Sequence, residues 1–227
     1  MSLLWDVIVV GAGAAGLVAA FRAAELGKRT LLLERNRRAG VKILMSGGTR
    51  CNITQATDNW GIVEAYGPPG RFLHSALAAL SVQDSIGLFE AEGVKTKVEE
   101  TGKVFPVSNK AADVLQALLA RLHRSGAELA LHEPVTELQL SGEQFCLTTP
   151  KRTLETPRLI LTTGGKSYPG SGTTGDGYQW AASLGHTIEP PRPALTPLTT
   201  NAAWILALKG ITLTDVTLTI LGGGKKL

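Results

Sequence analysis

Residues 7–34 read VIVVGAGAAGLVAAFRAAELGKRTLLLE, and this stretch decides the fold. The run from Leu3 to Val10 is short, apolar and rich in valine, as is typical of a strand buried inside a parallel sheet. It leads without a break into the glycine-rich turn Gly11–Gly16. A strand that runs directly into such a turn is the usual start of a βαβ unit.

The residues after the turn continue this pattern. Alanine and leucine dominate Leu17–Leu26, which predicts a helix, and Gly27 follows at the position where helices commonly end. Arg29–Leu33 predicts a second strand, which Glu34 closes. The order strand, turn, helix, strand and acid predicts a doubly wound α/β fold built on a parallel sheet.

Each glycine of the turn has a physical role in binding a dinucleotide. Gly11 permits the tight turn, Gly13 lets a pyrophosphate approach the backbone, and Gly16 lets the helix pack closely on the sheet. The N-terminus of the helix then offers free N–H groups and the positive end of its dipole to the phosphates. Glu34 is placed where a carboxylate accepts hydrogen bonds from the adenosine ribose, and its charge disfavours the 2′-phosphate of NADP.

Other nucleotide folds fit less well. A short-chain dehydrogenase pairs a tyrosine with a lysine four residues later, and none of Tyr66, Tyr168 and Tyr178 has a lysine at that spacing. A class I methyltransferase usually has a third glycine where this chain has Ala15. The alternative that stays open is a glycine-rich turn in an ordinary βαβ unit.

A basic segment follows Glu34. Residues 35–50 contain five cations and no acid, and the segment ends in SGGTRCN at residues 46–52. Backbone N–H groups of such a loop can bind an anion, and Arg50 can add fixed positive charge. A reduced flavin ring is anionic and needs such charge near its N1–C2=O edge. The alternative here is a solvated basic loop.

The middle of the chain is expected to mix helices and strands. Helices are predicted at residues 71–80, 82–92 and 108–124, with Ser81 and Asp84 capping the second and Ser108 capping the third. An apolar stripe on the third helix is expected to be core, and it contains Ala111, Val114, Leu115, Leu118, Leu119 and Leu122. Strands are predicted as a hairpin at 94–99 and 103–106, and as a meander at 128–131, 135–140 and 145–149.

A second glycine-rich segment follows another predicted strand, Arg158–Thr163. The strand ends at Gly164 and Gly165, at the edge of the sheet where open α/β proteins bind ligands. The loop KSYPGSGTTGDGY at 166–178 then leads into a predicted helix at 179–184. This position favours a role in holding a cofactor, and the alternative is a plain loop.

The end of the chain changes character. Four prolines fall within residues 190–197, which predicts a boundary. Apolar residues then alternate with a period of two over 206–221, which predicts strands of a new sheet. We therefore expect an FAD-binding Rossmann-like domain over 1–190. Residues 191–227 are expected to be the start of a β-rich substrate domain that is cut short.

Composition excludes several classes of protein. Hydrophobic residues are 44% and charged residues 19% of the chain, which excludes disorder. The net charge of +4 is not gathered into a basic stripe, so no nucleic-acid partner is expected. The two cysteines cannot form a disulfide framework, and the most apolar stretch is too short to span a bilayer. We therefore expect a cytoplasmic protein with no membrane partner.

The histidines do not predict a metal site. His74, His123, His132 and His186 are scattered, and none has a second ligand at metal-binding spacing on one element. The sequence identifies no catalytic acid or base.

Three segments together resemble a known family. DVIVVGAGAAGLVAA, GVKILMSGGTRCNIT and LTTGGKSYPGSGTTGDGY are similar to those of FAD-dependent oxidoreductases of the two-dinucleotide-binding-domain flavoprotein superfamily. The group with aminoacetone oxidase-like and 3-dehydro-bile-acid reductase-like flavoproteins resembles this chain most, over residues 1 to about 220. The SGGxRCN segment is the most specific part of the match.

The resemblance implies that FAD lies extended across the sheet. Gly11–Gly16 would hold the pyrophosphate, Glu34 the ribose and the Val135 backbone the adenine. Lys42 and Ser46–Asn52 would lie along the ribityl and flavin side, and Thr163–Gly165 near the middle of the cofactor. The cofactor-binding residues expected from the motif and the resemblance are Gly11, Gly13, Ala14, Ala15, Gly16, Glu34, Arg35, Lys42, Ser46, Gly47, Gly48, Arg50, Cys51, Asn52, Val135, Thr163, Gly164 and Gly165.

The chain departs from the family pattern in three respects. The family usually has arginine where this chain has Val41, which removes one positive charge, and glycine where it has Thr49. Family members are also longer, and their chain returns to complete the FAD domain after an inserted substrate domain. We therefore expect this chain alone to bind flavin weakly, to aggregate and to be nearly inactive.

The sequence thus predicts an FAD-dependent oxidoreductase. It would pass a hydride through the flavin between NAD(P)H, or an organic donor, and a small-molecule substrate. The alternative is a flavin- or nucleotide-binding fragment without turnover of its own.

Overall fold

The structure is a computed structural model that describes residues 5–192, 200–208, 211, 217, 219, 221–223 and 225–226. The chain divides into two compact units, Met1–Pro190 and Pro191–Leu227. That the first is an FAD-binding domain and the second the start of a substrate domain stays a prediction.

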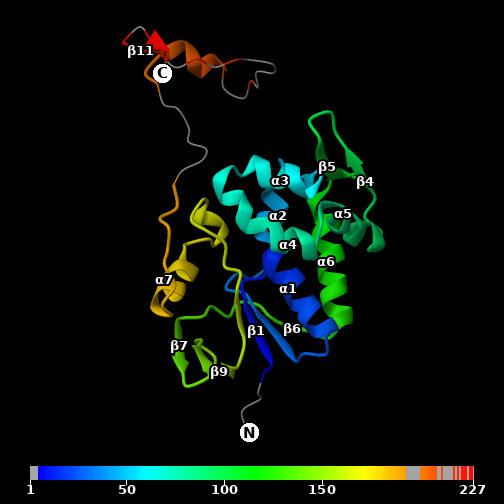
Figure 1. Ribbon diagram of the computed structural model, residues 1–227, viewed down its shortest axis with the longest axis vertical. Coiled ribbons are helices and arrows are strands. Elements are labelled where there is room, and N and C mark those ends of the chain that lie inside the picture. Colours follow the sequence, from blue (N-terminus) through cyan, green and yellow to red (C-terminus); the bar gives the residue numbers. More distant parts are fainter. Residues whose placement is uncertain are drawn as a thin grey trace. The chain divides into compact units, whose positions relative to one another are not determined.

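A four-stranded parallel sheet forms the centre of the first unit (Figure 1). Its order is β10 (Leu159–Leu161), β1 (Val7–Val10), β2 (Thr30–Leu33) and β6 (Glu128–Ala130). Every residue of β1 and β2 is buried, because these strands lie in the middle of the sheet with elements packed on both faces. The predicted α/β fold with a parallel sheet is confirmed.

Two helices pack against one face of the sheet. These are α1 (Ala14–Glu25) and α6 (Ala111–Ser125), which share a core with Val7 and Val9 of β1. The predicted stripe of α6 is buried except at Leu119, which is partly buried. Ser108 does not cap α6 as predicted. The helix begins at Ala111 after Lys110, whose side chain makes no capping bond, and Ser108 only accepts a bond from the Lys110 N–H at 3.3 Å.

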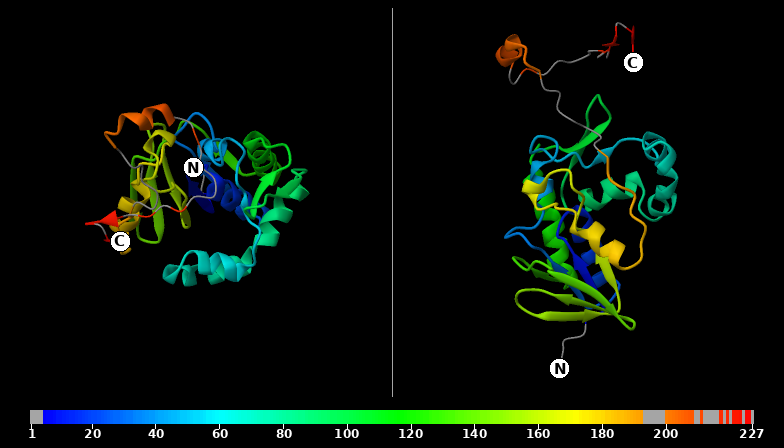
Figure 2. Two further views of the ribbon diagram at one scale, coloured as in Figure 1. Left: turned by 90° about the horizontal axis from the view of Figure 1, so that it is seen from above. Right: turned by 90° about the vertical axis from the view of Figure 1, so that its left-hand side faces the viewer.

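An antiparallel meander shares the core of the opposite face (Figure 2). It consists of β7 (Glu137–Ser141), β8 (Gln144–Thr148) and β9 (Thr153–Thr156), and its core contains Ile8 and Val10 of β1. A meander was predicted here, but one of the strands assigned to it was wrong. Residues 128–130 form the edge of the parallel sheet because they follow the crossover helix α6, and β9 completes the meander instead.

A long insertion lies between β2 and α6. Its elements in chain order are α2 (Val41–Met45), β3 (Thr54–Gln55), α3 (Asn59–Ala65), η1 (Pro68–Leu73), α4 (His74–Ala79), α5 (Val82–Ala91), β4 (Thr96–Val98) and β5 (Lys103–Pro106). The capping box of Ser81 and Asp84 at α5 and the β4–β5 hairpin are confirmed. The predicted helix over 71–80 is divided into a 3₁₀ turn and α4, and β3 adds an unpredicted strand to the hairpin.

The remaining described elements are short. In the first unit, η2 (Pro169–Ser171) precedes α7 (Asp176–Ser183). In the second unit, η3 (Ala203–Leu208) is a 3₁₀ helix, so the strand predicted to begin at residue 206 is wrong over 206–208. The strands β11 (Leu221–Gly222) and β12 (Lys225–Lys226) form an antiparallel pair. Most of the alternating stretch between η3 and β11 lies outside the described residues.

None of the described helices is by itself long and apolar enough to cross a bilayer. One pair, Pro68–Ala79 with Val82–Ala91, bent by 44°, meets the criteria of length and composition when taken together.

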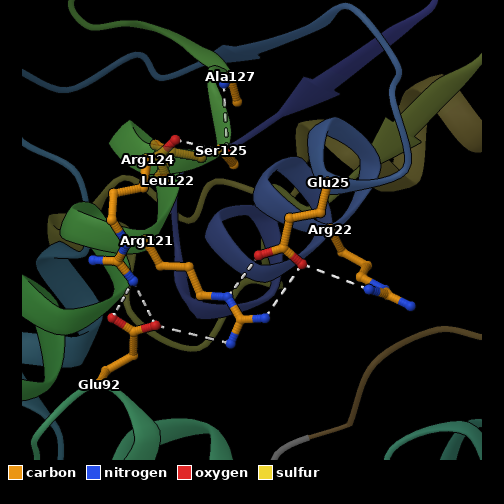
Figure 3. A network of polar contacts seen from close by, with 8 residues as sticks. All are labelled: Arg22, Glu25, Glu92, Arg121, Leu122, Arg124, Ser125 and Ala127. Carbon is orange, nitrogen blue, oxygen red and sulfur yellow. Dashed lines mark hydrogen bonds and ion pairs between the residues drawn. The ribbon is translucent and has the colours of Figure 1, made fainter.

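An ion-pair network joins α1, α6 and the residue that follows α5 (Figure 3). Arg121 donates from Nε to Glu25 Oε1 at 2.8 Å, and its guanidinium lies 4.5 Å from the centre of the Phe21 ring. Arg124 donates to both carboxylate oxygens of Glu92. Figure 3 shows Arg121 between Glu25 and Glu92, so a single cation bridges two acids on different elements.

Arg121→Met is expected to lower the free energy of unfolding by about 1–2 kcal/mol at pH 7. The hydrogen bond from Arg121 is the main reason that the pKa of the Glu25 carboxyl is lowered from 4.5. A lowered folded-state pKa stabilises the protein above the unfolded pKa, and this contribution is lost as the pH falls through the folded pKa. The difference between wild type and variant should therefore shrink below pH 4.5 in urea denaturation curves.

Arg22→Met is the matched control for this experiment. Arg22 is 63% exposed and lies 3.5 Å from Glu25, so its loss should change stability by less than about 0.5 kcal/mol. Equal effects of the two substitutions would contradict the assignment of the network to Arg121.

Candidate functional site

A cavity of about 390 Å³ opens at the carboxyl ends of the parallel strands. Its wall is formed by the glycine turn, the segment after β2, the loop around Cys51, the segment before β7 and the loop before α7. These segments come from positions more than 150 residues apart in the chain, and the sheet brings them together. Open α/β folds bind ligands at this edge.

The three glycines of the turn have different surroundings. A Cβ on Gly11, which has φ +104°, would lie 2.6 Å from the carbonyl oxygen of Thr162. A Cβ on Gly16 would overlap the carbonyl oxygen of Gly11. A Cβ on Gly13 would meet no atom within 4 Å, and Gly13 lines the cavity. Gly11 and Gly16 therefore serve the packing of the turn, whereas Gly13 leaves space for a ligand.

The N-terminus of α1 faces this space without a competing side chain. Gly13 is its N-cap and makes no side-chain bond, and the first turn contains no acid. The N–H groups at the start of a helix have no partner within the helix, so those of Ala14 and Ala15, which line the cavity, are available to a ligand. Together with the helix dipole they favour an anion such as a pyrophosphate.

Glu34 is held rigidly at the end of β2. Its Oε2 accepts from the Ala12 N–H at 2.7 Å, its Oε1 accepts from the Asn36 N–H at 2.9 Å, and it is 7% exposed. Each carboxylate oxygen can accept a second bond, so the group is preorganised to receive hydroxyl donors from the cavity.

Two cations connect the segment after β2 with the loop before α7. Arg35 donates to Asp176 and to Thr174, each at 2.8 Å. Lys42 donates to Ser167 Oγ at 3.1 Å and to Thr173 Oγ1 at 3.4 Å. The basic segment that follows Glu34 and the glycine-rich loop at residues 166–178 are therefore directly joined at the cavity.

The loop at residues 46–52 has an unusual backbone. Gly47, Gly48, Thr49 and Cys51 all have positive φ, between +55° and +71°. Such values cost little for glycine but are strained for Thr49 and Cys51. Burial raises the pKa of the Cys51 thiol, which keeps it protonated at neutral pH.

Arg50 does not face the cavity. It forms an ion pair with Glu99 of the β4–β5 hairpin at 2.6 Å, and its guanidinium lies 4.0 Å from the centre of the Phe105 ring. The positive charge expected from Arg50 is thus neutralised by an acid on the inserted hairpin, a contact that local sequence cannot reveal.

The structure brings most of the predicted site residues to the cavity wall. Those that line it are Gly11, Gly13, Ala14, Ala15, Glu34, Arg35, Lys42, Ser46, Cys51, Asn52, Val135, Thr163 and Gly164. Those that do not are Gly16, Gly47, Gly48, Arg50 and Gly165. Within the part of the chain that the structure describes, no three His, Cys, Asp or Glu side chains form a metal-binding group.

Several lining residues were not singled out from the sequence. Val114 and Leu118 belong to the α6 stripe, which was predicted to be core, and their buried side chains also form part of the cavity wall. Glu133, Pro134 and Trp180 carried no local signal of a site. Their contribution depends on how the meander and α7 pack near the end of the sheet.

Comparisons with known proteins agree with this architecture. The sequence pattern of the HI0933-like protein Rossmann domain matches residues 5–224. The ribosomal RNA dihydrouridine synthase of Haemophilus influenzae is 34% identical over 98% of this chain and 56% of its own length. The 3-dehydro-bile acid Δ(4,6)-reductase of Clostridium scindens is 32% identical over 84% of this chain and 46% of its own length. The chain thus spans about half the length of the curated relatives it matches.

A solved structure shows the same fold. The 3-ketosteroid-Δ4-(5α)-dehydrogenase of Rhodococcus jostii matches with a TM-score of 0.53 and 16% identity, over 71% of this chain and 46% of that chain. At this identity the similarity extends to the fold alone.

Proposed function

The chain belongs to the HI0933-like family, and on this premise we propose that it is the FAD-binding part of an enzyme that reduces a C=C bond conjugated to a carbonyl group. Proteins of this family bind FAD and are FAD-dependent oxidoreductases, as the resemblance in the sequence implied. The bond type, the substrate and the residue roles below are our proposal.

The groups around the cavity suit the parts of FAD. The open space at Gly13 and the N–H groups of Ala14 and Ala15 suit a pyrophosphate, and Glu34 suits the ribose hydroxyls. Val135 would lie at the adenine. Ser46, Cys51 and Asn52 would lie along the ribityl chain and the flavin. When bound, FAD supplies hydride transfer at its ring, and these residues bind and orient it.

The names of the relatives point to one kind of bond, a C=C bond conjugated to a carbonyl group, and this observation carries the proposal. A dihydrouridine differs from uridine by two hydrogens across a C=C bond conjugated to a ring carbonyl. A Δ(4,6)-reductase of a 3-dehydro-bile acid is named for C=C bonds conjugated to a ketone. Addition of a hydride to one carbon and of a proton to the other would reduce either bond, and this step balances atoms and charge. We therefore propose the same reaction for this chain.

Uridine in ribosomal RNA is the leading candidate substrate. Two relatives named as ribosomal RNA dihydrouridine synthases, from Haemophilus influenzae and Escherichia coli, match 98% and 86% of this chain. These names argue against the expectation that no nucleic acid is involved, and a net charge of +4 is compatible with an RNA substrate. A small enone of the steroid type is the second candidate, favoured by the bile-acid reductase.

The experiment offers both substrates to the same enzyme preparation. The full chain is loaded with FAD, reduced with NADPH or dithionite without oxygen, and mixed with unmodified ribosomal RNA or with a 3-oxo-Δ4 steroid. A gain of two hydrogens in a uridine, detected by mass spectrometry of digested RNA, supports the leading candidate. A saturated steroid product supports the second. A chain that binds FAD but changes neither substrate would favour a binding fragment without turnover of its own.

Glu34→Ala is expected to weaken FAD binding by roughly 10- to 150-fold, because hydrogen bonds to a charged group contribute about 1.5–3 kcal/mol. The dissociation constant is measured by the change in flavin fluorescence on titration. Glu99→Ala removes a carboxylate that lies outside the cavity wall and is the matched control. A Glu34→Ala dissociation constant within twofold of the control would mean that the ribose binds elsewhere.

A further inference from the structure

The short segment before β7 forms one wall of the cavity. Glu133, Pro134 and Val135 line it, between the parallel sheet and the meander. The backbone of this segment is fixed on one side by the residues after β2. The N–H of His132 donates to the Asn36 carbonyl at 3.0 Å, and that of Glu133 donates to the Glu34 carbonyl at 2.8 Å.

The other side of the segment is fixed by the side chain of Glu133. Its Oε1 accepts from Arg152 Nε at 2.9 Å and lies 3.1 Å from the Thr149 hydroxyl, and its Oε2 accepts from the second Arg152 nitrogen at 3.3 Å. Glu133 is 3% exposed and Thr149 is 5% exposed. Lys151 is a more distant partner, with Nζ at 3.9 Å from Oε2.

Thr149 and Arg152 belong to the tight turn between β8 and β9. The Thr149 N–H donates to the Arg152 carbonyl, and the Thr149 hydroxyl accepts from the Arg152 N–H, both at 3.0 Å. The turn therefore fixes the distance between the Thr149 and Arg152 side chains, which both contact Glu133. A buried carboxylate without these donors would strongly destabilise the protein. The bonds from Thr149 and Arg152 to Glu133 therefore fix the position of the segment.

We propose that Thr149 and Arg152 are positioning residues for the adenosine half of the bound dinucleotide. They act through Glu133, which fixes Pro134 and Val135 in the cavity wall, and they do not themselves line the cavity. This inference rests on the proposed function, which places the adenine at Val135. It also gives the meander a role. The β8–β9 turn supports the binding site from the face of the sheet that lies opposite to α1 and α6.

The test measures binding of ADP to the full chain by calorimetry, because ADP carries the adenosine and both phosphates of FAD but no flavin. Arg152→Met is expected to raise the dissociation constants of ADP and FAD by the same factor, about tenfold. Arg152→Lys keeps the charge but loses the two-point contact, and it should recover part of the affinity. Lys151→Met, on the same turn, removes a half-exposed cation that lies 3.9 Å from Glu133 and donates to the Leu131 carbonyl at 3.2 Å, and it should change both constants less than twofold.

A second variant covers the case in which Arg152→Met does not fold. Glu133→Gln with Arg152→Met removes the buried charge together with its partner, so no unpaired ion is left. This double variant should fold and should still bind ADP about tenfold more weakly. ADP affinity equal to wild type in either folded variant would overturn the inference. Failure of the wild type itself to bind ADP would instead count against the proposed function.

Discussion

Gly13→Val is expected to lower the affinity for FAD by more than about 100-fold, equivalent to about 2.7 kcal/mol, and to leave the fold intact. The backbone of Gly13 has φ −79° and ψ −170°, an extended conformation that valine adopts readily. No atom lies within 4 Å of the added Cβ, so the side chain meets only the space that we assign to the pyrophosphate. Flavin fluorescence titration gives the affinity, and thermal unfolding gives the stability.

Gly87→Val provides the matched control. Gly87 lies in α5, where a Cβ also meets no atom within 4 Å, but it is exposed and does not line the cavity. This variant should bind FAD like the wild type and melt within a few degrees of it. Retention of full FAD affinity by Gly13→Val would show that the pyrophosphate does not lie at the start of α1.

Gly16→Val is expected to have the opposite result, a loss of the fold. The added Cβ would overlap the Gly11 carbonyl oxygen and lie 2.7 Å from Thr162 Oγ1, which itself bonds to the Val10 and Gly11 carbonyls. Because the Gly11 carbonyl is part of the backbone of the turn and the Thr162 hydroxyl is held by two backbone carbonyls, α1 would have to move away from the sheet. We expect destabilisation of at least about 3 kcal/mol, measured by urea denaturation with circular dichroism.

The contrast between neighbouring glycines makes this result informative. Gly13 and Gly16 share one turn, yet one variant should lose the ligand and the other the fold. A Gly16→Val protein with the urea midpoint of the wild type would mean that α1 does not pack on β1 as closely as the structure indicates.

Local patterns in the sequence predicted the central part of this fold. The βαβ unit, the buried stripe of α6 and the capping box of α5 each depend on residues within a few positions of one another. The pairing of strands, in contrast, does not depend on nearby residues alone. Residues 128–131 read as a strand, but their pairing with β2 depends on a crossover of nearly 100 residues. β9 is a four-residue strand, TLET, with little apolar character to reveal it.

The candidate site followed the same division. The glycines of the turn and Glu34 were identifiable because a motif fixes their spacing, and the structure places Gly11, Gly13 and Glu34 in the wall of one cavity. The contacts of Arg35 and Lys42 with residues 167–176, and of Glu133 with Arg152, join positions that no local pattern connects. Arg50 was expected at the site because it lies in a basic loop. Its ion-pair partner is Glu99 on the inserted hairpin, which the local sequence does not reveal.

Equilibrium dialysis of the full 227-residue chain against FAD, with NAD in parallel, tests the central claim most directly. We predict weak but saturable binding of one FAD per chain, competition by ADP, and loss of both in Gly13→Val but not in Gly87→Val. NAD should bind more weakly than FAD, because it offers no flavin to the wall formed by Ser46, Cys51 and Asn52. Tighter binding of NAD than of FAD, or FAD binding that Gly13→Val leaves unchanged, would contradict it.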